Sequence, residues 1–402
     1  GYNSFDVLED GYGLNLRPLS VFASEVYRDD PCTYFYPHTL DDVVYDSIEH
    51  SLTAKMHKAI AVIQFKLEGQ LIKNHPEYGM DGRCFFDKVD FGRGVINIGG
   101  KEYELRDKSF PTVDVSDPLK LSREESELVR ILQSSFRHSG RLRQHIKFIY
   151  DHGGMYRKIN GNLLYHGCIP LNDDGSFREI TLPFADCAGK TFHGKALLDR
   201  IEQEVRSAYF SPNGTKEQKE AADFMWYLWC GADSPLYGKD KMAFFERTFL
   251  GKEAAELCTE HYEPYYSHTN DASVCEMILE EFGLDKRRGH IVNGHVPVLR
   301  CDGESPIKAG GKLFVIDGGI SKAYRVKTGI AGYTLIYDSH SLRLAEHKPY
   351  DGEGADITPK VSIVEKMERR VNIADIDYGE ELMVRINDLH SLIEAYRNGK
   401  IR

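Results

Sequence analysis

Residues 161–170 read Gly-Asn-Leu-Leu-Tyr-His-Gly-Cys-Ile-Pro, a short apolar run that ends in His166. A run of this length bounded by glycine predicts a buried β-strand. The pattern returns at residues 289–298, Gly-His-Ile-Val-Asn-Gly-His-Val-Pro-Val, where the run ends in His295. Helical patterns separate the two runs, and strands that alternate with helices are typical of an α/β sheet. The sequence therefore predicts a mixed α/β (α+β) fold.

His166 and His295 are the first candidates for chemistry. Each follows a predicted strand, and the carboxyl ends of strands are where α/β sheets place functional groups. The glycine beside His166 lets another backbone or a metal approach closely. Two neutral imidazoles that converge could bind Mn, Fe or Zn. The alternative is a pair of hydrogen-bonded structural histidines, which is also the role expected of His290 at the other end of the second strand.

A third strand pattern, at residues 313–316, leads into a glycine pair and a basic segment. The residues of interest there are Gly318, Gly319, Lys322, Tyr324 and Arg325. Glycines expose backbone N–H groups, and lysine and arginine supply positive charge, so the segment predicts a phosphate pocket. The alternative is a solvated basic loop.

Arg247 lies downstream of an aromatic segment, Trp-Tyr-Leu-Trp at residues 226–229. Aromatic residues at helical spacing are typical of a core. The planar guanidinium of Arg247 could bind a phosphate through two hydrogen bonds, or it could form a structural salt bridge.

Along the chain we expect three regions. Residues 1–150 are predicted to be mostly helical with a β-hairpin insert, residues 151–349 to form the α/β core, and residues 350–402 to be a linker and a terminal helix. Within the core, helices are expected at about 193–209, 216–229 and 272–282, and strands at 291–293, 313–316, 333–337 and 342–346.

The first region carries three local signals. Apolar residues fall close to a 3.6-residue period over residues 45–73, which predicts a long helix. The Gly-Gly pair at residues 99–100 predicts the turn of a hairpin. Ser122 followed by Glu125 predicts a capping box that opens another helix, with a break near Ser139.

Composition excludes several classes of protein. The chain has 51 Lys and Arg against 62 Asp and Glu, a net charge of −11, which argues against nucleic acid as a partner. Its apolar stretches are far shorter than the about 20 residues of a membrane span, so no membrane partner is expected. The eight cysteines lie far apart without a Cys-x-x-Cys pair, and we expect them to be reduced in the cytoplasm.

Several blocks of the chain resemble the class III fructose-1,6-bisphosphatases of bacteria. They are residues 12–19, 161–170, 226–229, 291–298, 316–324 and 328–335. The resemblance runs over essentially the whole chain. It is specific because the motifs occur in the order that the family shows.

The resemblance implies the C-terminal part of a calcineurin-like metallophosphatase β-sandwich, flanked by helices and preceded by a largely helical region with a small β insert. It implies a dinuclear metal site, usually supplied with Mn, that hydrolyses the 1-phosphate of fructose 1,6-bisphosphate in gluconeogenesis. His166 and His295 match two histidines that bind the same metal in this superfamily. Arg247 is the nearest match to its phosphate-binding arginine. The partner implied is a small sugar bisphosphate.

The superfamily also uses Asp-x-His, Gly-Asp-x-x-Asp-Arg-Gly and Gly-Asn-His-Asp/Glu motifs. The last two are absent, and Asp338-Ser339-His340, an Asp-x-His, falls in a predicted hairpin turn. From the resemblance we expect the missing motifs, with the general-acid histidine, upstream of Tyr12. We therefore expect this chain alone to be inactive or nearly so. A sheet edge left uncovered would favour a homo-oligomer.

Two other interpretations stay open. One is another calcineurin-like phosphoesterase, in which the basic segment binds a different leaving group. The other is a non-catalytic regulatory or interaction module, which the missing ligand motifs favour.

Overall fold

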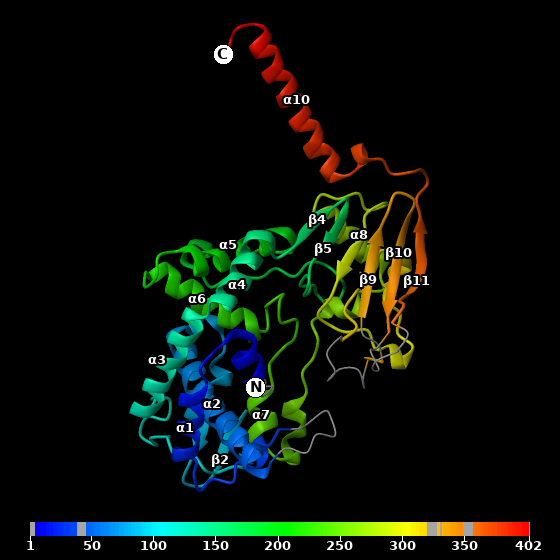
Figure 1. The fold of residues 1–402 in the computed structure, drawn as a ribbon. Coiled ribbons are helices and arrows are strands. Elements are labelled where there is room, and N and C mark those ends of the chain that lie inside the picture. Colours follow the sequence, from blue (N-terminus) through cyan, green and yellow to red (C-terminus); the bar gives the residue numbers. More distant parts are fainter. Residues whose placement is uncertain (1–4, 38–45, 320–327, 330–331, 349–356, 402) are drawn as a thin grey trace. The chain divides into compact units, whose positions relative to one another are not determined.

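The computed structural model describes residues 5–37, 46–319, 328–329, 332–348 and 357–401. The chain divides into two compact units (Figure 1). The first comprises Gly1–Gly154, Thr181–Thr191 and Gln203–Tyr262, and the second comprises Met155–Ile180, Phe192–Glu202 and Glu263–Arg402. The expected boundaries at residues 150 and 349 stay a prediction, because compactness alone does not define a domain that folds by itself.

The first unit is mainly helical, with one small antiparallel sheet in the order β1-β2-β3. Its helices are α1 (Arg17–Val26), α2 (Ser47–Asn74), α3 (Arg123–His138), α4 (Gly140–His152), α6 (Lys216–Cys230) and α7 (Phe244–Phe249). Its strands are β1 (Val89–Asp90), β2 (Val95–Ile98) and β3 (Lys101–Glu104). A π-helical turn at Val7–Gly11 and 3₁₀ turns at Thr33–Phe35, Pro76–Tyr78, Asp81–Arg83, Phe86–Lys88, Ala185–Cys187 and Lys252–Cys258 complete it.

Helix α2 organises this unit because its buried face carries two lysines with matched acidic partners. Lys58 Nζ lies 2.6 Å from Asp30 Oδ2 and 2.8 Å from Asp107 Oδ2. Lys66 Nζ lies 2.7 Å from Glu125 Oε2, and both side chains are fully buried. A buried charge is tolerated only when it is paired and hydrogen-bonded. These ion pairs therefore tie three distant segments of the chain to one helix.

An aromatic cluster packs on the same helix. The ring centroid of Phe65 lies 5.1 Å from that of Phe245 and 5.9 Å from that of Phe249, both on α7. The Phe85 and Phe245 rings stack with their centroids 4.3 Å apart. Such pairs stabilise beyond the burial of their area. They attach the segment that carries Arg247 to the N-terminal helices.

The three local signals of the first region are confirmed. The long helix is α2, and the Gly-Gly pair forms the turn between β2 and β3. Ser122 Oγ accepts the Glu125 N–H at 3.1 Å, and Glu125 Oε2 accepts the Ser122 N–H at 2.7 Å, which is the capping box. The break near Ser139 separates α3 from α4.

The second unit holds two sheets. The larger sheet has the order β4-β5-β6-β8-β7, in which β5, β6 and β8 run parallel and the edge strands β4 and β7 run antiparallel to their neighbours. Its strands are β4 (Arg157–Ile159), β5 (Asn162–Leu164), β6 (Ile291–Asn293), β7 (Ile307–Lys308) and β8 (Leu313–Val315). The smaller antiparallel sheet contains β9 (Gly332–Tyr337), β10 (Ser341–His347) and β11 (Lys360–Lys366), with β10 in the centre.

Three helices among the described residues belong to this unit. They are α5 (Gly194–Phe210), which runs on into the first unit, α8 (Ala272–Glu281) and α10 (Asp377–Arg397). Short 3₁₀ turns lie at Pro264–Ser267, Arg300–Asp302, Ala309–Gly311 and Ile373–Asp375. The helices expected at 193–209, 216–229 and 272–282 are thereby confirmed as α5, α6 and α8.

One hydrophobic core serves both sheets of the second unit. Leu163 and Ile291 of the larger sheet, Leu279 of α8 and Leu344 of β10 belong to the same buried cluster. His290, just before β6, adds a polar link, since its Nδ1 lies 2.9 Å from the Gly311 carbonyl and its Nε2 lies 3.0 Å from Glu365 Oε2 on β11. The structural role expected of His290 is confirmed.

The mixed α/β fold class is confirmed, and the calcineurin-like topology stays a prediction. The sequence analysis did not anticipate β11. Its side chains are mostly exposed, so Lys360–Lys366 shows little of the burial pattern that marks a strand. The strand forms because β10 offers its free edge, to which β11 pairs antiparallel. Pairing of this kind depends on a neighbour and leaves a weak signal in the sequence.

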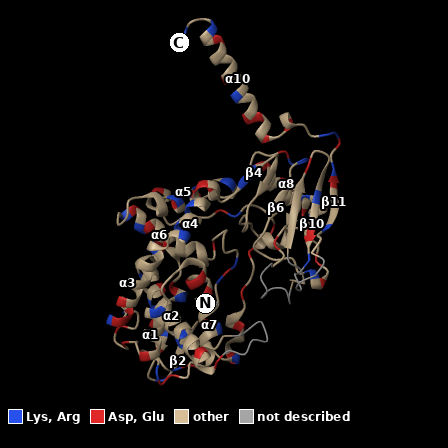
Figure 2. Cartoon of the chain, viewed as in Figure 1, with Lys and Arg blue, Asp and Glu red and all other residues tan. Residues whose placement is uncertain are grey.

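No helix among the described residues combines the length and the apolar character that crossing a membrane requires. Acidic and basic residues are interspersed in both units (Figure 2). All eight cysteines are free thiols.

The Lys66–Glu125 pair gives a test of the first unit. We expect Glu125→Gln to lower the free energy of unfolding by about 3–5 kcal/mol, because it leaves the Lys66 ammonium buried without a counter-charge. Glutamine at this position preserves the capping box, so the helix start is not the cause of the loss. Urea denaturation followed by tryptophan fluorescence measures it, since Trp226 and Trp229 both lie in this unit.

Lys66→Met combined with Glu125→Gln should recover a large part of that loss, because no charge is then left buried. Glu256→Gln is the matched control: Glu256 forms an exposed pair with Lys101, and its removal should leave the transition almost unchanged. Equal losses in the single and double variants would contradict the assignment.

Candidate metal and phosphate site

The structure brings His166 and His295 together. They follow β5 and β6, which are parallel neighbours with Leu163 opposite Ile291. Parallel pairing places the carboxyl ends of both strands at one edge of the sheet. The two imidazole centroids are 5.3 Å apart, with the ring planes at 83°. The predicted convergence of these two side chains is therefore present, while their role as metal ligands stays a prediction.

Asn293, the last residue of β6, holds the loop that carries His166. Its Nδ2 lies 3.3 Å from the carbonyl oxygen of Tyr165, 3.1 Å from that of His166 and 2.7 Å from that of Gly167. The side chain is only 2% exposed. The Gly294 N–H adds a 3.2 Å hydrogen bond to the His166 carbonyl. The sequence analysis missed Asn293, whose only signal was a polar residue at the end of an apolar strand.

Gly294 is required by the close approach of the two loops. A Cβ at this position would lie 3.0 Å from His166 Nδ1 and 3.4 Å from its Cε1. Any larger residue would therefore press on the imidazole ring. The absence of a side chain at Gly294 lets the His166 ring come close.

His295 has an unusual backbone conformation. Its φ is +67°, in the left-handed region that residues with a Cβ rarely adopt. Such a conformation costs about 1–3 kcal/mol and persists only where the surroundings enforce it. The loop that follows β6 turns at His295, at a cost that the surrounding structure offsets.

The Gly318-Gly319 turn lies at the same edge of the sheet. It follows β8, the neighbour of β6 on the side away from β5. The Ile316 N–H donates to the Asn293 carbonyl at 3.0 Å, and the Val298 N–H donates to the Asp317 carbonyl at 3.0 Å. Loops after three adjacent parallel strands thus share one edge.

The glycine turn is stabilised internally. Asp317 Oδ1 accepts the Gly319 N–H at 2.9 Å, and Gly319 has a φ of +66°. This N–H group is therefore occupied, and a phosphate at the turn would need other donors. Lys322, Tyr324 and Arg325, the other members of the predicted phosphate pocket, lie outside the described residues.

Arg247 lies in the first unit and forms a structural ion pair. Its Nη1 lies 3.1 Å from Glu260 Oε1, and its Nη2 donates to the Cys258 carbonyl at 3.1 Å. Burial raises the pKa of Glu260, but hydrogen bonds from Lys239 and the Ala243 amide outweigh it and hold the pKa below its usual value. The salt-bridge alternative is thereby observed, and the phosphate-binding role stays a prediction.

No group of three or more His, Cys, Asp or Glu side chains that could hold an ion occurs among the described residues. A divalent transition metal takes at least four ligands. Two imidazoles from His166 and His295 fit part of such a site by the chemistry of their donors.

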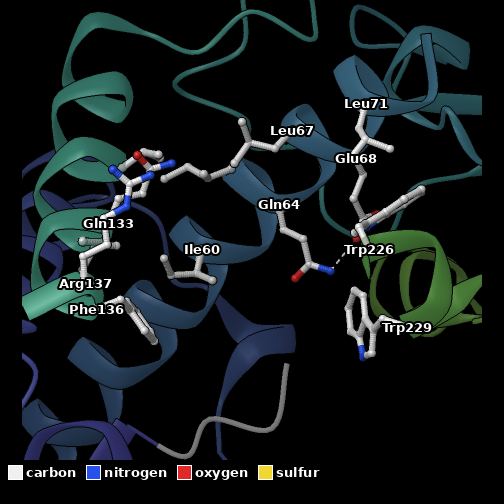
Figure 3. Close-up of a pocket in the computed structure, with 13 residues that line it drawn as sticks. Ile60, Gln64, Leu67, Glu68, Leu71, Gln133, Phe136, Arg137, Trp226 and Trp229 are labelled. Atoms are coloured by element: carbon white, nitrogen blue, oxygen red, sulfur yellow. Dashed lines mark hydrogen bonds between the residues drawn. The ribbon is translucent and has the colours of Figure 1, made fainter. Parts of the chain in front are cut away.

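A separate apolar groove lies within the first unit, between α2, α3 and α6 (Figure 3). Its volume is about 540 Å³, and Leu67, Phe136 and Trp229 line it. Burial raises the pKa of Glu68 in its wall, and the 2.8 Å hydrogen bond from Gln64 partly opposes this rise. The lining suits apolar groups, not a doubly phosphorylated sugar.

Comparisons with known proteins agree with one another. A family model described as Firmicute fructose-1,6-bisphosphatase matches residues 1–398. The fructose-1,6-bisphosphatase class 3 of Bacteroides fragilis is 48% identical over 408 residues, that of Alkaliphilus metalliredigens 46% over 407, and that of Listeria innocua 46% over 406. Each match covers 100% of this chain. No solved structure matches it.

The chain spans 60–61% of the length of these curated relatives. What their names say about activity therefore applies to proteins that are longer than the chain described here.

The backbone of His295 yields a prediction about stability. His295→Val should lower the free energy of unfolding by about 1–2 kcal/mol more than His295→Asn, because asparagine tolerates the left-handed region and a β-branched residue does not. At His166, which has no positive φ, the same two substitutions should differ less. Thermal or urea denaturation of the four variants measures these differences in the free energy of unfolding. If valine and asparagine differ equally at both positions, the backbone of His295 is not strained.

Gly294→Ala should displace the His166 ring by a few tenths of an ångström, because the new methyl group would lie 3.0 Å from Nδ1. In spectra of protein with labelled histidine, the imidazole signals of His166 should shift. Gly82→Ala is the control, since a Cβ there meets nothing within 4 Å. Unmoved His166 signals would contradict the contact.

Proposed function

This chain belongs to the Firmicute fructose-1,6-bisphosphatase family, and from that premise we propose that it serves the hydrolysis of fructose 1,6-bisphosphate to fructose 6-phosphate and phosphate, a step of gluconeogenesis. The observation that carries the proposal is the pair of imidazoles at the carboxyl edge of the larger sheet, 5.3 Å apart. Metal-assisted phosphate hydrolysis needs side chains that hold the ion, and the carboxyl ends of strands are where α/β sheets place functional groups.

We propose that His166 and His295 hold one divalent ion, which the resemblance gives as Mn. An ion bound there would act as a Lewis acid and would neutralise charge on the phosphoryl oxygens. Imidazole suits Mn, Fe and Zn, so the donor set does not by itself select among them. The remaining ligands and the general-acid histidine would come from residues other than this pair.

Three features of the chain would position that pair. The three hydrogen bonds of Asn293 fix the backbone on either side of His166. Gly294 allows the ring of His166 to lie against the neighbouring loop, and the left-handed backbone of His295 turns the second loop. Ligands held in advance lose little freedom when an ion binds, which favours affinity.

The phosphate-binding residues are proposed from the chemistry of their side chains and their place in the sequence. Lys322 and Arg325 follow the glycine turn that shares the sheet edge with the histidines, and Tyr324 lies between them in sequence. We propose that this basic segment binds a phosphate of the sugar. Arg247 would have to exchange Glu260 for a phosphate in order to take part.

Metal binding tests the pair without relying on turnover. We expect Mn²⁺ titrated into the chain by calorimetry to bind, and His166→Ala or His295→Ala to weaken binding by more than about tenfold, because each removes a ligand. His261→Ala is the control, since His261 is an exposed histidine paired with Asp240 in the first unit. Binding that neither substitution changes would contradict the site.

Phosphate release from fructose 1,6-bisphosphate with added Mn²⁺ tests the activity. The ligand count predicts slow turnover or none by this chain alone, and any turnover should disappear in His166→Ala. Turnover that survives both histidine substitutions would place the reaction elsewhere. Faster release from another ester in a panel of phosphate esters would favour a different phosphoesterase.

A further inference from the structure

Helix α10 presents an apolar surface that nothing in the described part of the chain covers. Of its 21 residues, Asp377–Arg397, only Gly379 is buried. Eight large apolar side chains on the helix are more than 40% exposed, namely Tyr378, Met383, Val384, Ile386, Leu389, Leu392, Ile393 and Tyr396. Most helical stability in proteins comes from packing an apolar face, so a helix whose apolar face is uncovered lacks its main source of stability.

The apolar residues follow a coiled-coil repeat. Leu382, Ile386, Leu389, Ile393 and Tyr396 are separated by four, three, four and three residues. This alternation is the a/d pattern of a heptad, with an average spacing of 3.5 residues. A helix packed on a globular core usually shows a broader apolar face with a 3.6-residue period. The pattern therefore fits another helix as the partner.

The two ends of α10 differ in charge. Its first turns carry Asp377, Glu380 and Glu381, and Arg397 and Lys400 lie at or just beyond its last turn, with Arg385, Asp388 and Glu394 between them. Two such helices side by side in parallel would set like charges against each other. In the antiparallel arrangement the acidic start of each helix lies beside the basic end of the other, and the helix dipoles are also opposed favourably.

The base of α10 is fixed while its apolar stripe is left accessible. The Asn160 N–H donates to Asp377 Oδ2 at 2.8 Å, and the Asp377 N–H donates to Asn160 Oδ1 at 3.1 Å. These reciprocal bonds join the first turn of the helix to the turn between β4 and β5. The helix therefore starts from a defined point of the second unit and extends about 30 Å, at about 1.5 Å per residue.

We propose that α10 pairs with α10 of a second copy of this chain as an antiparallel coiled coil. The heptad stripe supplies the apolar contact, and the opposed charges of the two ends supply the orientation. In a two-fold dimer both copies use the same surface, so the stripe of one α10 packs against the identical stripe of the other.

Sedimentation equilibrium of the full chain over a range of concentrations tests the pairing. We expect a dimer that Leu389→Glu weakens by about 100-fold or more, because the substitution sets a charge in the middle of the apolar seam. Val384→Glu is the matched control. Val384 lies outside the stripe and is 60% exposed against 58% for Leu389, so both changes leave the fold of a single copy intact.

A chain that stays monomeric at micromolar concentrations would overturn the proposal. So would a dimer that Leu389→Glu does not weaken, or one that both substitutions weaken equally. Each of these three outcomes would mean that the stripe does not form a dimer interface.

Zero-length cross-linking tests the orientation. Copies with and without ¹⁵N are mixed, treated with a carbodiimide and digested, so that links between copies are identified by mass. The antiparallel arrangement predicts links from Lys400 of one copy to Asp377 or Glu380 of the other. Links from Lys400 to Glu394 of the other copy, without links to the acidic end, would overturn the antiparallel arrangement.

Discussion

The parallel pairing of β5, β6 and β8 is the constraint on which the candidate site depends. Each of these strands has only three residues, yet their main-chain hydrogen bonds align three carboxyl ends at one edge. His166, His295 and the Gly318-Gly319 turn come from segments separated by long stretches of chain, and this register brings them together. A shift of one residue in either pairing would turn the side chains to opposite faces and separate the two histidines.

The edge is maintained by polar contacts that a hydrophobic core could not supply. The buried amide of Asn293 shares its two N–H donors among three consecutive carbonyl groups, which would otherwise be costly to bury. The left-handed backbone of His295 adds a cost that the rest of the sheet must offset. Backbone strain of this kind clusters at functional sites. The role of the histidine pair as metal ligands stays a prediction.

In the first unit, buried ion pairs specify the packing of the helices. Helix α2 buries two lysines, and each finds acidic partners from distant segments. Such pairs contribute less to stability than apolar residues of the same volume, but they tolerate only one arrangement of their partners. They specify how the N-terminal helices pack, while the aromatic cluster around Phe65 supplies the burial. The apolar groove and the stripe on α10 are two places among the described residues where apolar side chains stay in water.

The sequence by itself determined the local elements and the chemistry of the candidates. The period of α2, the Gly-Gly hairpin, the capping box and the strand-to-histidine runs were all readable, because each depends on residues within one turn or one strand of each other. The tertiary structure decided the rest: the 5.3 Å approach of the two rings, the role of Asn293, the strand β11 and the partner of Arg247. These depend on residues that are far apart in the chain and meet only through strand pairing and burial. No local pattern encodes such a meeting, because periodicity records which face of an element is buried and not what lies against it.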